Sequence, residues 1–424
     1  MLEEIIIKGL FNQFDYHIKL KSNDITILTG PNGYGKTTIL KIIYAIATKN
    51  LSIFFKLNFK EIFLKFKNDS IKILKNSKDT ISIKSNNDKA IELKNNEIIP
   101  KEMKRWLENT YYRQIDENLW IDRRTEIAYP TENLIDLYIE NFPEKNIKYS
   151  HKSLPDLMDV YLIREQRLLR KKTYNRNNNS FFINDESNLN FTNTIEEYAK
   201  ELSRNLKDSL AKASKIGQEL DSTFPQRLFE ENETITECIF NERFNAIKEK
   251  QNALSTYGLS ASLKDNHTSF KNENAKPLLV YLNDTEKKLA VFDELYEKLN
   301  LFSDILNERR FAFKKMEISP ENGLKFVSEH NEPLALTDLS SGEQQEIVLL
   351  YELLFRVKPN TLVMIDEPEI SLHVAWQKDF LNDLMKIIKL QKITVITATH
   401  SPQIINNNWD LTIDLYDLAK EKMA

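Results

Sequence analysis

A short segment near the N-terminus has the residue types and spacing of a phosphate-binding loop. Residues 30–37 match the pattern GxxxxGK[ST], in which two glycines flank four residues and precede a lysine and a hydroxyl. An apolar run at 25–28 precedes the loop, and apolar residues at helical spacing follow it. In that context, backbone N–H groups can surround a phosphate, and the helix N-terminus adds a favourable dipole. The expected nucleotide-binding residues are Gly30, Asn32, Gly33, Gly35, Lys36, Thr37 and Thr38.

Two side chains of this loop have distinct expected roles. The ammonium of Lys36 would reach the β- and γ-phosphates of a nucleotide, and the hydroxyl of Thr37 would be a ligand for Mg²⁺. The alternative is a plain glycine-rich turn, which would rarely carry Lys-Thr between a strand and a helix. The chain has only eight glycines, and three of them lie in this loop. Because the chain has so few glycines, the presence of three in one loop indicates that the backbone there approaches a ligand closely.

A second candidate site follows an apolar run late in the chain. Residues 361–365 are mostly apolar and are followed by Asp366 and Glu367. In α/β folds, ligands bind at the carboxyl ends of strands. Asp366 is then placed to hold Mg²⁺, and Glu367 to act as the general base for an attacking water. Alone, Asp-Glu after a strand would equally fit a solvated turn, but the phosphate-binding loop favours the catalytic interpretation.

The segment Ser340-Ser341-Gly342-Glu343 precedes a predicted helix. Ser340 and Gly342 supply a hydroxyl and backbone N–H groups at a helix N-terminus, which suits an anion. The same segment fits an ordinary capping box, with Glu343 as the third helical residue. Taken by itself, the capping box is the favoured interpretation.

His400 follows a predicted strand at 393–397 and lies 34 residues beyond Asp366. That separation corresponds to one strand–helix–strand step, so His400 could stand beside the carboxylates as a sensor of the γ-phosphate. A lone histidine after a strand is more often structural.

Composition limits the class of protein. The 424 residues are 41% hydrophobic and 29% charged, with a net charge of −4, which allows a sizeable core and gives no global case for nucleic-acid binding. The single cysteine, Cys238, excludes an internal disulfide and a multi-cysteine zinc site, and we expect it to be buried. No apolar stretch approaches the roughly 18 residues of a membrane span. Acidic residues lie at the N-terminus, where a secretory signal would have basic residues, so we expect a cytoplasmic location.

The apolar pattern predicts an α/β fold with a helical insertion. Short strands are expected near 5–7, 18–20, 25–28 and 161–163, and alternation over 62–93 predicts an antiparallel sheet with a lysine-rich outer face. Helices at 343–356 and 374–388 alternate with strands at 361–365 and 393–397, which predicts a largely parallel sheet. Residues 101–160 give no clear pattern.

Between these regions, amphipathic stripes predict helices. One stripe covers 195–220 and another covers 289–306, each predicted as a single helix, with further helix near 231–253. They are expected to form an antiparallel hairpin or small bundle. The predicted domains are a nucleotide-binding domain in two parts, 1–194 and 317–424, and the helical insertion 195–316.

The order of these motifs resembles that of ABC-type ATPases, and their SMC/Rad50-like branch more than the transporter ATPases. The resemblance implies a head with a P-loop, a mixed sheet and an antiparallel β subdomain, with ATP and Mg²⁺ as cofactors and hydrolysis to ADP and phosphate. It also implies that Gln166 contacts Mg²⁺ and the attacking water. Ser340, Gly342 and Glu343 correspond to the signature that contacts the γ-phosphate of nucleotide on a partner subunit, and His400 to the switch histidine. A homodimer or higher homo-oligomer with ATP at the interface follows from the resemblance.

Several departures separate the chain from transporter ATPases. Ser341 and Glu343 replace the glycine and glutamine of the transporter signature, and 174 residues separate Gln166 from Ser340. The zinc hook of Rad50 is absent because there is no CxxC motif. Only 24 residues follow His400, so we expect the C-terminal Toprim nuclease of OLD-type relatives to be missing.

Two sequence segments are similar to those of a more specific group of proteins: residues 30–37, and Asp-Glu-Pro-Glu-Ile-Ser-Leu-His at 366–373. In these segments the chain resembles stand-alone ATPase subunits of bacterial anti-phage systems, of the PARIS (AriA) or Septu (PtuA) type. This resemblance implies an ATP-driven switch that controls a separate nuclease of HNH or Toprim type. The alternative is a DNA-repair or chromosome-handling ATPase, similar to SMC and RecF proteins, that binds DNA directly. Residues 164–176, with six basic residues and one acid, are a candidate nucleic-acid contact, although such runs are usually solvated loops.

Overall fold

The structure, a computed structural model, falls into two compact units. It describes residues 1–21, 24–86, 90–94, 101–108, 110–116, 119–123, 126, 128–130, 134, 157–164, 169–171, 191–261, 270–308, 311, 313–370 and 372–420. Of these, unit 1 contains 1–164 and 357–420, and unit 2 contains 169–171 and 191–356. Residues 317–356, predicted as part of the ATP-binding head, group here with the helices.

A five-stranded parallel sheet forms the centre of unit 1. Its order is β11 (Val160–Ile163), β17 (Leu362–Asp366), β18 (Thr394–Ala398), β3 (Ile25–Thr29) and β19 (Thr412–Asp414). All neighbours are parallel, as the alternating pattern predicts. Ala398 of β18 pairs with Asp366 on one side and with Leu28 on the other. The carboxyl ends of these three strands therefore lie level, and the segments that follow them meet at one edge of the sheet.

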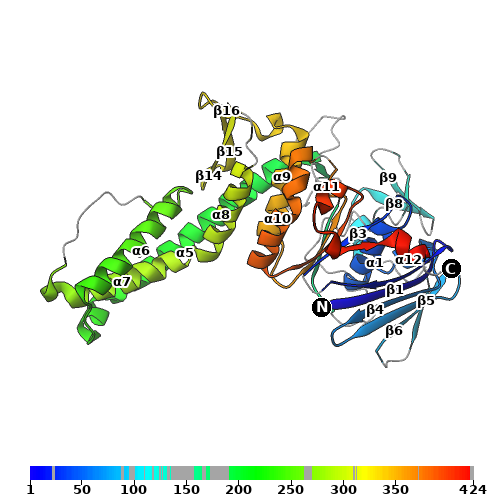
Figure 1. The fold of residues 1–424 in the computed structure, drawn as a ribbon, viewed down its shortest axis with the longest axis horizontal. Helices are drawn as coiled ribbons and strands as arrows, with labels where there is room; N and C mark the ends of the chain where they lie inside the picture. Colours follow the sequence, from blue (N-terminus) through cyan, green and yellow to red (C-terminus); the bar gives the residue numbers. More distant parts are fainter. Residues whose placement is uncertain are drawn as a thin grey trace. The chain divides into compact units, whose positions relative to one another are not determined.

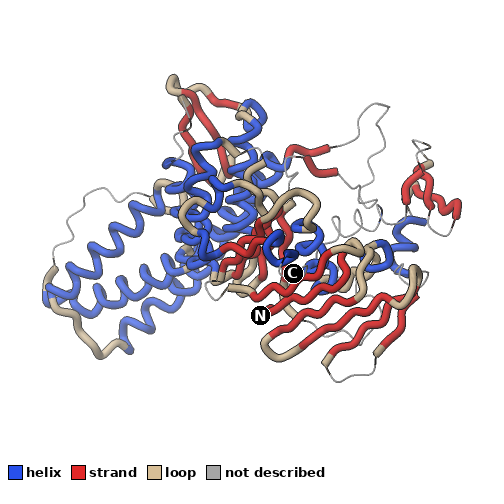
Figure 2. Tube along the Cα trace, turned by 45° about the vertical axis from the view of Figure 1, so that its right-hand side comes forward, coloured by secondary structure: helices blue, strands red, loops and turns tan. Residues whose placement is uncertain are grey.

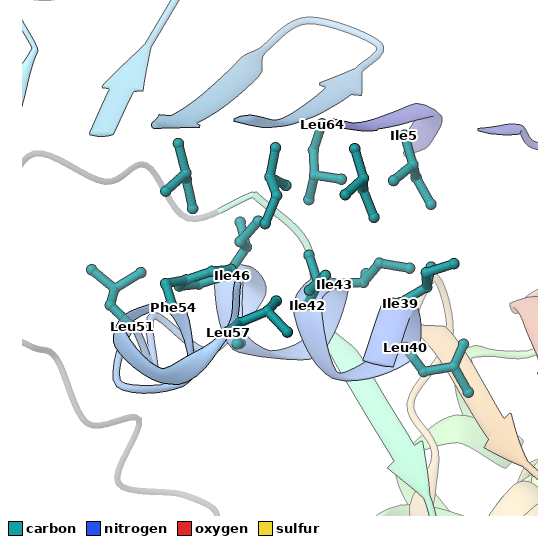
Figure 3. Packing of buried hydrophobic residues seen from close by; sticks show 14 of the residues in the cluster. Ile5, Ile39, Leu40, Ile42, Ile43, Ile46, Leu51, Phe54, Leu57 and Leu64 are labelled. Atoms are coloured by element: carbon teal, nitrogen blue, oxygen red, sulfur yellow. The ribbon is translucent and has the colours of Figure 1, made fainter. Parts of the chain in front are cut away.

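An antiparallel sheet of six strands covers the first helix of unit 1. Its order is β2 (Phe14–Lys19), β1 (Leu2–Leu10), β4 (Glu61–Phe66), β5 (Ser70–Lys75), β6 (Thr80–Ser85) and β7 (Ile91–Lys94). Alternate residues are buried, which confirms the predicted apolar face. Helix α1 (Lys36–Ala47) and the short α2 (Ile53–Lys56) present isoleucine, leucine and phenylalanine side chains to this face, opposite Ile5 and Leu64 (Figure 3).

The other elements of unit 1 are smaller, apart from one helix. They are α3 (Lys101–Glu108), a sheet of β8 (Tyr112–Asp116), β9 (Leu119–Asp122) and β10 (Ala128–Pro130), α10 (Val374–Gln391), α11 (Pro402–Ile405), η5 (Trp409–Leu411) and α12 (Leu415–Lys420). The long α10 connects β17 to β18 and confirms the predicted helix at 374–388. The three-stranded sheet and α3 occupy the region in which the sequence shows no clear pattern.

Unit 2 consists mainly of helices. These are α5 (Thr194–Glu230), α6 (Glu237–Ser255), η2 (Asn272–Asn274), α7 (Ala275–Ala290), α8 (Asp293–Glu308), η3 (Leu336–Asp338), α9 (Ser341–Tyr351) and the π-helical turn η4 (Glu352–Arg356). Helix α7 packs against both α5 and α6 (Figures 1 and 2). The strands are the pair β12 (Leu169–Lys171) and β13 (Phe191–Asn193), and the sheet β14 (Lys314–Ser319), β15 (Gly323–Ser328) and β16 (Pro333–Leu334). None of the helices in the described ranges is long and apolar enough to cross a membrane.

The prediction of one helix over 289–306 is wrong, because α7 ends at Ala290 and α8 begins at Asp293. Leu289, Phe292 and Leu299 are all buried. The apolar stripe therefore keeps its spacing of three and four across the break, and periodicity cannot show the turn between the two helices.

The prediction that Cys238 is buried is also wrong, since its side chain is exposed. The buried face of α6 contains Phe240, Ile247 and Leu254, at intervals of seven residues. Cys238 lies two residues before Phe240, which places it about 200° around the helix, on the side away from the core.

Gly323 of β15 offers a direct test of packing in unit 2. Its φ is +68°, and an added Cβ would lie 1.8 Å from the backbone oxygen of Ala199 in α5. We predict that Gly323→Ala lowers the free energy of unfolding by at least about 2 kcal/mol, measured by urea denaturation. Gly217→Ala in α5 is the matched control, because its Cβ would meet only a flexible lysine at 3.4 Å. An unchanged urea midpoint for Gly323→Ala would contradict this packing.

Candidate nucleotide-binding and catalytic site

The loop between β3 and α1 has the backbone of a phosphate-binding loop. Gly30, Gly33 and Gly35 have φ values of +132°, +88° and +87°, a region that side-chain-bearing residues avoid. Gly35 directly precedes α1, so Lys36 is the first residue of the helix. The sequence pattern thus folds into a turn that directs the N-terminus of α1 toward the concave side of the loop.

A cavity of about 200 Å³ lies at this loop. Its lining combines most of the predicted loop residues with the predicted base: Asn32, Gly33, Gly35, Lys36, Thr37, Thr38 and Glu367, together with Phe11. Phe11 follows β1 and was not predicted, because no motif surrounds it. Its backbone has a positive φ of 54°, and its ring would lie 3.2 Å from a Cβ at Gly35.

Lys36 is almost fully buried, with 5% exposure. Its ammonium donates to the carbonyl oxygens of Gly30, at 2.8 Å, and Pro31, at 3.4 Å. It also lies 3.9 Å from Oε1 of Glu367. The cation is therefore held over the loop, and a bound phosphate would add acceptors for its three hydrogens.

Thr37 and Asp366 join the loop to the end of β17. The Thr37 hydroxyl donates to Oδ1 of Asp366 at 2.9 Å. A hydroxyl and a carboxylate at this separation are hard oxygen donors of the kind that Mg²⁺ binds beside a nucleotide. The two side chains therefore fit the predicted metal site.

Glu367 stands one residue beyond β17 and faces the cavity. Its φ is +45°, and its N–H donates to the carbonyl of Ala398 at 2.9 Å. Burial of the side chain, with the nearby carboxylate of Glu369, raises the pKa of Glu367 to about 7, while His400 opposes the rise. A carboxyl group with a pKa near 7 suits the role of a general base at neutral pH.

His400 lies against Glu367, as the strand–helix–strand spacing suggests. Its Nδ1 is 2.6 Å from Oε2 of Glu367 and 3.3 Å from Oε1 of Glu369, and its side chain is half exposed. The structure therefore brings Lys36, Glu367 and His400 into one group. Ligand atoms of Glu367, Glu369 and His400 all lie within 4.8 Å of one another, close enough to share a cation.

Glu369 was not among the predicted site residues. It is 8% exposed, and its Oε1 accepts from the hydroxyl of Thr399 at 2.6 Å. It also accepts from the backbone N–H groups of His400, at 3.0 Å, and Ser401, at 3.2 Å. The signal that could have found it is a second acid two residues after Glu367, in Asp-Glu-Pro-Glu.

The predicted signature residues lie in unit 2, at the start of α9. Ser340 accepts from the N–H of Glu343 at 3.3 Å and donates its own N–H to Oε2 of Glu343 at 2.7 Å, so both halves of the capping box are present. Lys314 also contacts this carboxylate, at 2.8 Å. Burial raises the pKa of Glu343, but the hydrogen bonds from Lys314 and Ser340 outweigh it and leave the pKa below its ordinary value. The contact of Ser340, Gly342 and Glu343 with nucleotide stays a prediction.

Gln166 lies outside the described residues, as does most of the basic stretch 164–176.

Residues 1–405 match the AAA ATPase domain family along nearly the whole chain. The chain belongs to this family. Among curated proteins, this AAA ATPase domain is 28% identical over 169 residues to a retron Ec83 probable ATPase of Escherichia coli, covering 37% of the chain and 28% of that protein. It is 31% identical over 121 residues to the cell division ATP-binding protein FtsE of Streptococcus pneumoniae, covering 28% of the chain and 49% of that protein. The alignments thus span half or less of the length of these relatives.

Among solved structures, the AAA ATPase domain is similar to SMC heads. An SMC head bound to the C-winged helix domain of ScpA has a TM-score of 0.37 at 11% identity, covering 96% of this chain and 91% of that one. The SMC head domain of Thermotoga maritima has a TM-score of 0.34 at 11% identity, covering 95% and 90%.

We predict that Lys36→Ala weakens nucleotide binding at least about 30-fold, equivalent to ~2 kcal/mol, because a buried cation facing the phosphates is lost. Binding of a fluorescent ATP analogue measures the effect. Lys41→Ala is the matched control, because Lys41 is an exposed lysine of the same helix. Equal affinities for the two variants would contradict the assignment of the loop.

We also predict that Glu367→Gln keeps nucleotide binding but lowers ATP turnover at least about 100-fold, because an amide cannot accept the proton of water. Its affinity for ATP should rise slightly, since a carboxylate 3.9 Å from Lys36 is neutralised. Phosphate release measures turnover, and Glu3→Gln, an exposed residue of β1, is the control. Undiminished turnover would remove Glu367 from the role of base.

Proposed function

We propose that this AAA ATPase domain is the ATP-binding and hydrolysing switch subunit of a bacterial anti-phage defence system, and that it controls a separate nuclease. The proposed hydrolysis of ATP is supported by the position of Glu367. Its carboxylate lines the cavity of the phosphate-binding loop, between Lys36 at 3.9 Å and His400 at 2.6 Å. A proton acceptor beside a phosphate site is what hydrolysis of a terminal phosphate needs.

The chemistry follows from the positions of the side chains. Backbone N–H groups of the loop and the ammonium of Lys36 bind the phosphates. Thr37 and Asp366 would hold Mg²⁺, which when bound neutralises charge on the phosphate oxygens. Glu367 accepts the proton of the attacking water, and the contact of His400 Nδ1 with Oε2 fixes the orientation of that carboxylate.

The switch itself is proposed to be assembly. By resemblance, Ser340 and Gly342 of one copy would contact the γ-phosphate of ATP bound to another copy, so that ATP is enclosed in a homodimer. Hydrolysis would then release the copies and change the state of the bound nuclease. The similarity to a retron ATPase supports the defence role, and a cytoplasmic location is part of the proposal.

The test is the molar mass of the Glu367→Gln protein by light scattering, with and without ATP, alone and with the product of the neighbouring gene. We expect ATP to double the mass of the protein alone and to retain the neighbouring nuclease in the complex. Lys36→Ala, which should bind ATP at least about 30-fold more weakly, is the control. A mass that ATP leaves unchanged would contradict the switch. An ATP-dependent dimer that ignores the neighbouring product but retains duplex DNA would favour the DNA-repair or chromosome-handling alternative instead.

A further inference from the structure

The buried carboxylate of Glu369 connects the loops that follow β17 and β18 by hydrogen bonds. Oε1 of Glu369 accepts three hydrogen bonds, from the Thr399 hydroxyl and from the backbone N–H groups of His400 and Ser401. The side chain of Thr399 is completely buried. Oε2 of Glu369 is buried without a hydrogen-bond partner in the described part of the chain. Oε1 also lies 3.3 Å from Nδ1 of the His400 ring, so the carboxylate contacts both the backbone and the ring of His400.

These bonds act on the backbone that carries the His400 ring. Glu367 donates its N–H to Ala398, so the two loops begin in register at the ends of their strands. Glu369 then holds the N–H of His400 at 3.0 Å, and the ring extends from that fixed point to reach Oε2 of Glu367 at 2.6 Å. Without Glu369, the N–H of His400 and the buried hydroxyl of Thr399 would lose this acceptor, while the N–H of Ser401 would keep only the Thr399 hydroxyl at 3.0 Å. The backbone from which the ring extends would then be less restrained.

We propose that Glu369 is a positioning residue, whose carboxylate holds the backbone of His400 so that its ring stays against the catalytic base Glu367. The inference rests on the proposed hydrolysis of ATP. Glu369 is not itself a catalytic residue, because the described residues that line the cavity include Glu367 and not Glu369. A carboxylate suits the role, since hydrogen bonds to a charged acceptor are stronger than those to a neutral one.

Three variants separate positioning from a general structural role. Glu369→Ala removes the acceptor and should lower kcat at least about tenfold, with the dissociation constant for ATP within about twofold of the wild type. Glu369→Gln keeps an oxygen acceptor in the same place but removes the charge beside Glu367, and should lower kcat less than Glu369→Ala does. Thr399→Val removes one donor with little change of shape and should lower kcat about two- to fivefold. It provides the test if Glu369→Ala fails to fold. Asp410→Ala, an exposed acid of unit 1, is the control.

The second readout is the coupling to His400. If Glu369 acts through His400, then Glu369→Ala should cost less than about twofold in kcat when it is added to His400→Ala. A purely structural residue would cost the same factor in both backgrounds. Full kcat in Glu369→Ala, or losses that multiply in the double variant, would overturn the proposal.

A third readout does not depend on catalysis. The chain has six histidines, and NMR of ring-labelled histidine, with His400 identified by its absence in His400→Ala, reports the surroundings of that ring. In the nucleotide-free protein, Thr399→Val, which leaves the Glu369 carboxylate beside the ring, should shift the His400 signal and leave the other five in place. An unshifted His400 signal would refute positioning. If the wild type fails to hydrolyse ATP, the proposed function falls, and this measurement still decides the role of Glu369.

Discussion

The register of three parallel strands is the constraint on which the site depends. Ala398 pairs with Asp366 on one side and Leu28 on the other, so β3, β17 and β18 end level. For this reason the hydroxyl of Thr37 reaches Asp366 at 2.9 Å across 329 residues of sequence. A slip of one residue in β17 would turn Asp366 to the opposite face of the sheet and would remove the carboxylate from the loop. The interior of these strands is buried and apolar apart from Thr26 and Thr397, and the carboxylate of β17 stands only at its end.

The second constraint is the cost of withdrawing charge from water. Lys36 and Glu369 are buried and hydrogen-bonded: the ammonium donates to two loop carbonyls, and Oε1 of the carboxylate accepts from three donors. Glu367 is less well compensated, since it has His400 at 2.6 Å and Lys36 only at 3.9 Å. Burial of Glu367 and the nearby carboxylate of Glu369 outweigh the contact with His400, so the pKa of Glu367 rises to about 7. Burial and the neighbouring carboxylate therefore leave Glu367 able to take up a proton near neutral pH.

The sequence predicts those parts of the site that depend on local pattern. The loop at 30–37 combines a motif with its flanking strand and helix, and Asp366 ends an apolar strand, so both could be assigned without tertiary information. Phe11 could not, because its place in the cavity arises from contact with the loop at Gly35. Glu369 has a local signal, the second acid of Asp-Glu-Pro-Glu, but its donors at residues 399–401 are brought to it by the pairing of β17 with β18. The break after Ala290 could not be predicted for a different reason. An apolar stripe that keeps its spacing through a two-residue turn has the same pattern as a continuous helix.

In unit 2, the contacts of α9 join the capping box to the long helix α5. At its C-terminal end α9 continues into η4, where Glu352 accepts from the hydroxyl of Tyr198, and Arg356 pairs with Glu201 at 2.8 Å and lies 4.6 Å from the Tyr198 ring. A π-helical turn is rare and less favourable than α-helix, so it persists because these contacts stabilise it. Helix α9, which begins after Ser340, is thus packed through its C-terminal end against the first turns of α5. Displacement of either helix must break this charged and aromatic cluster or move the other helix with it.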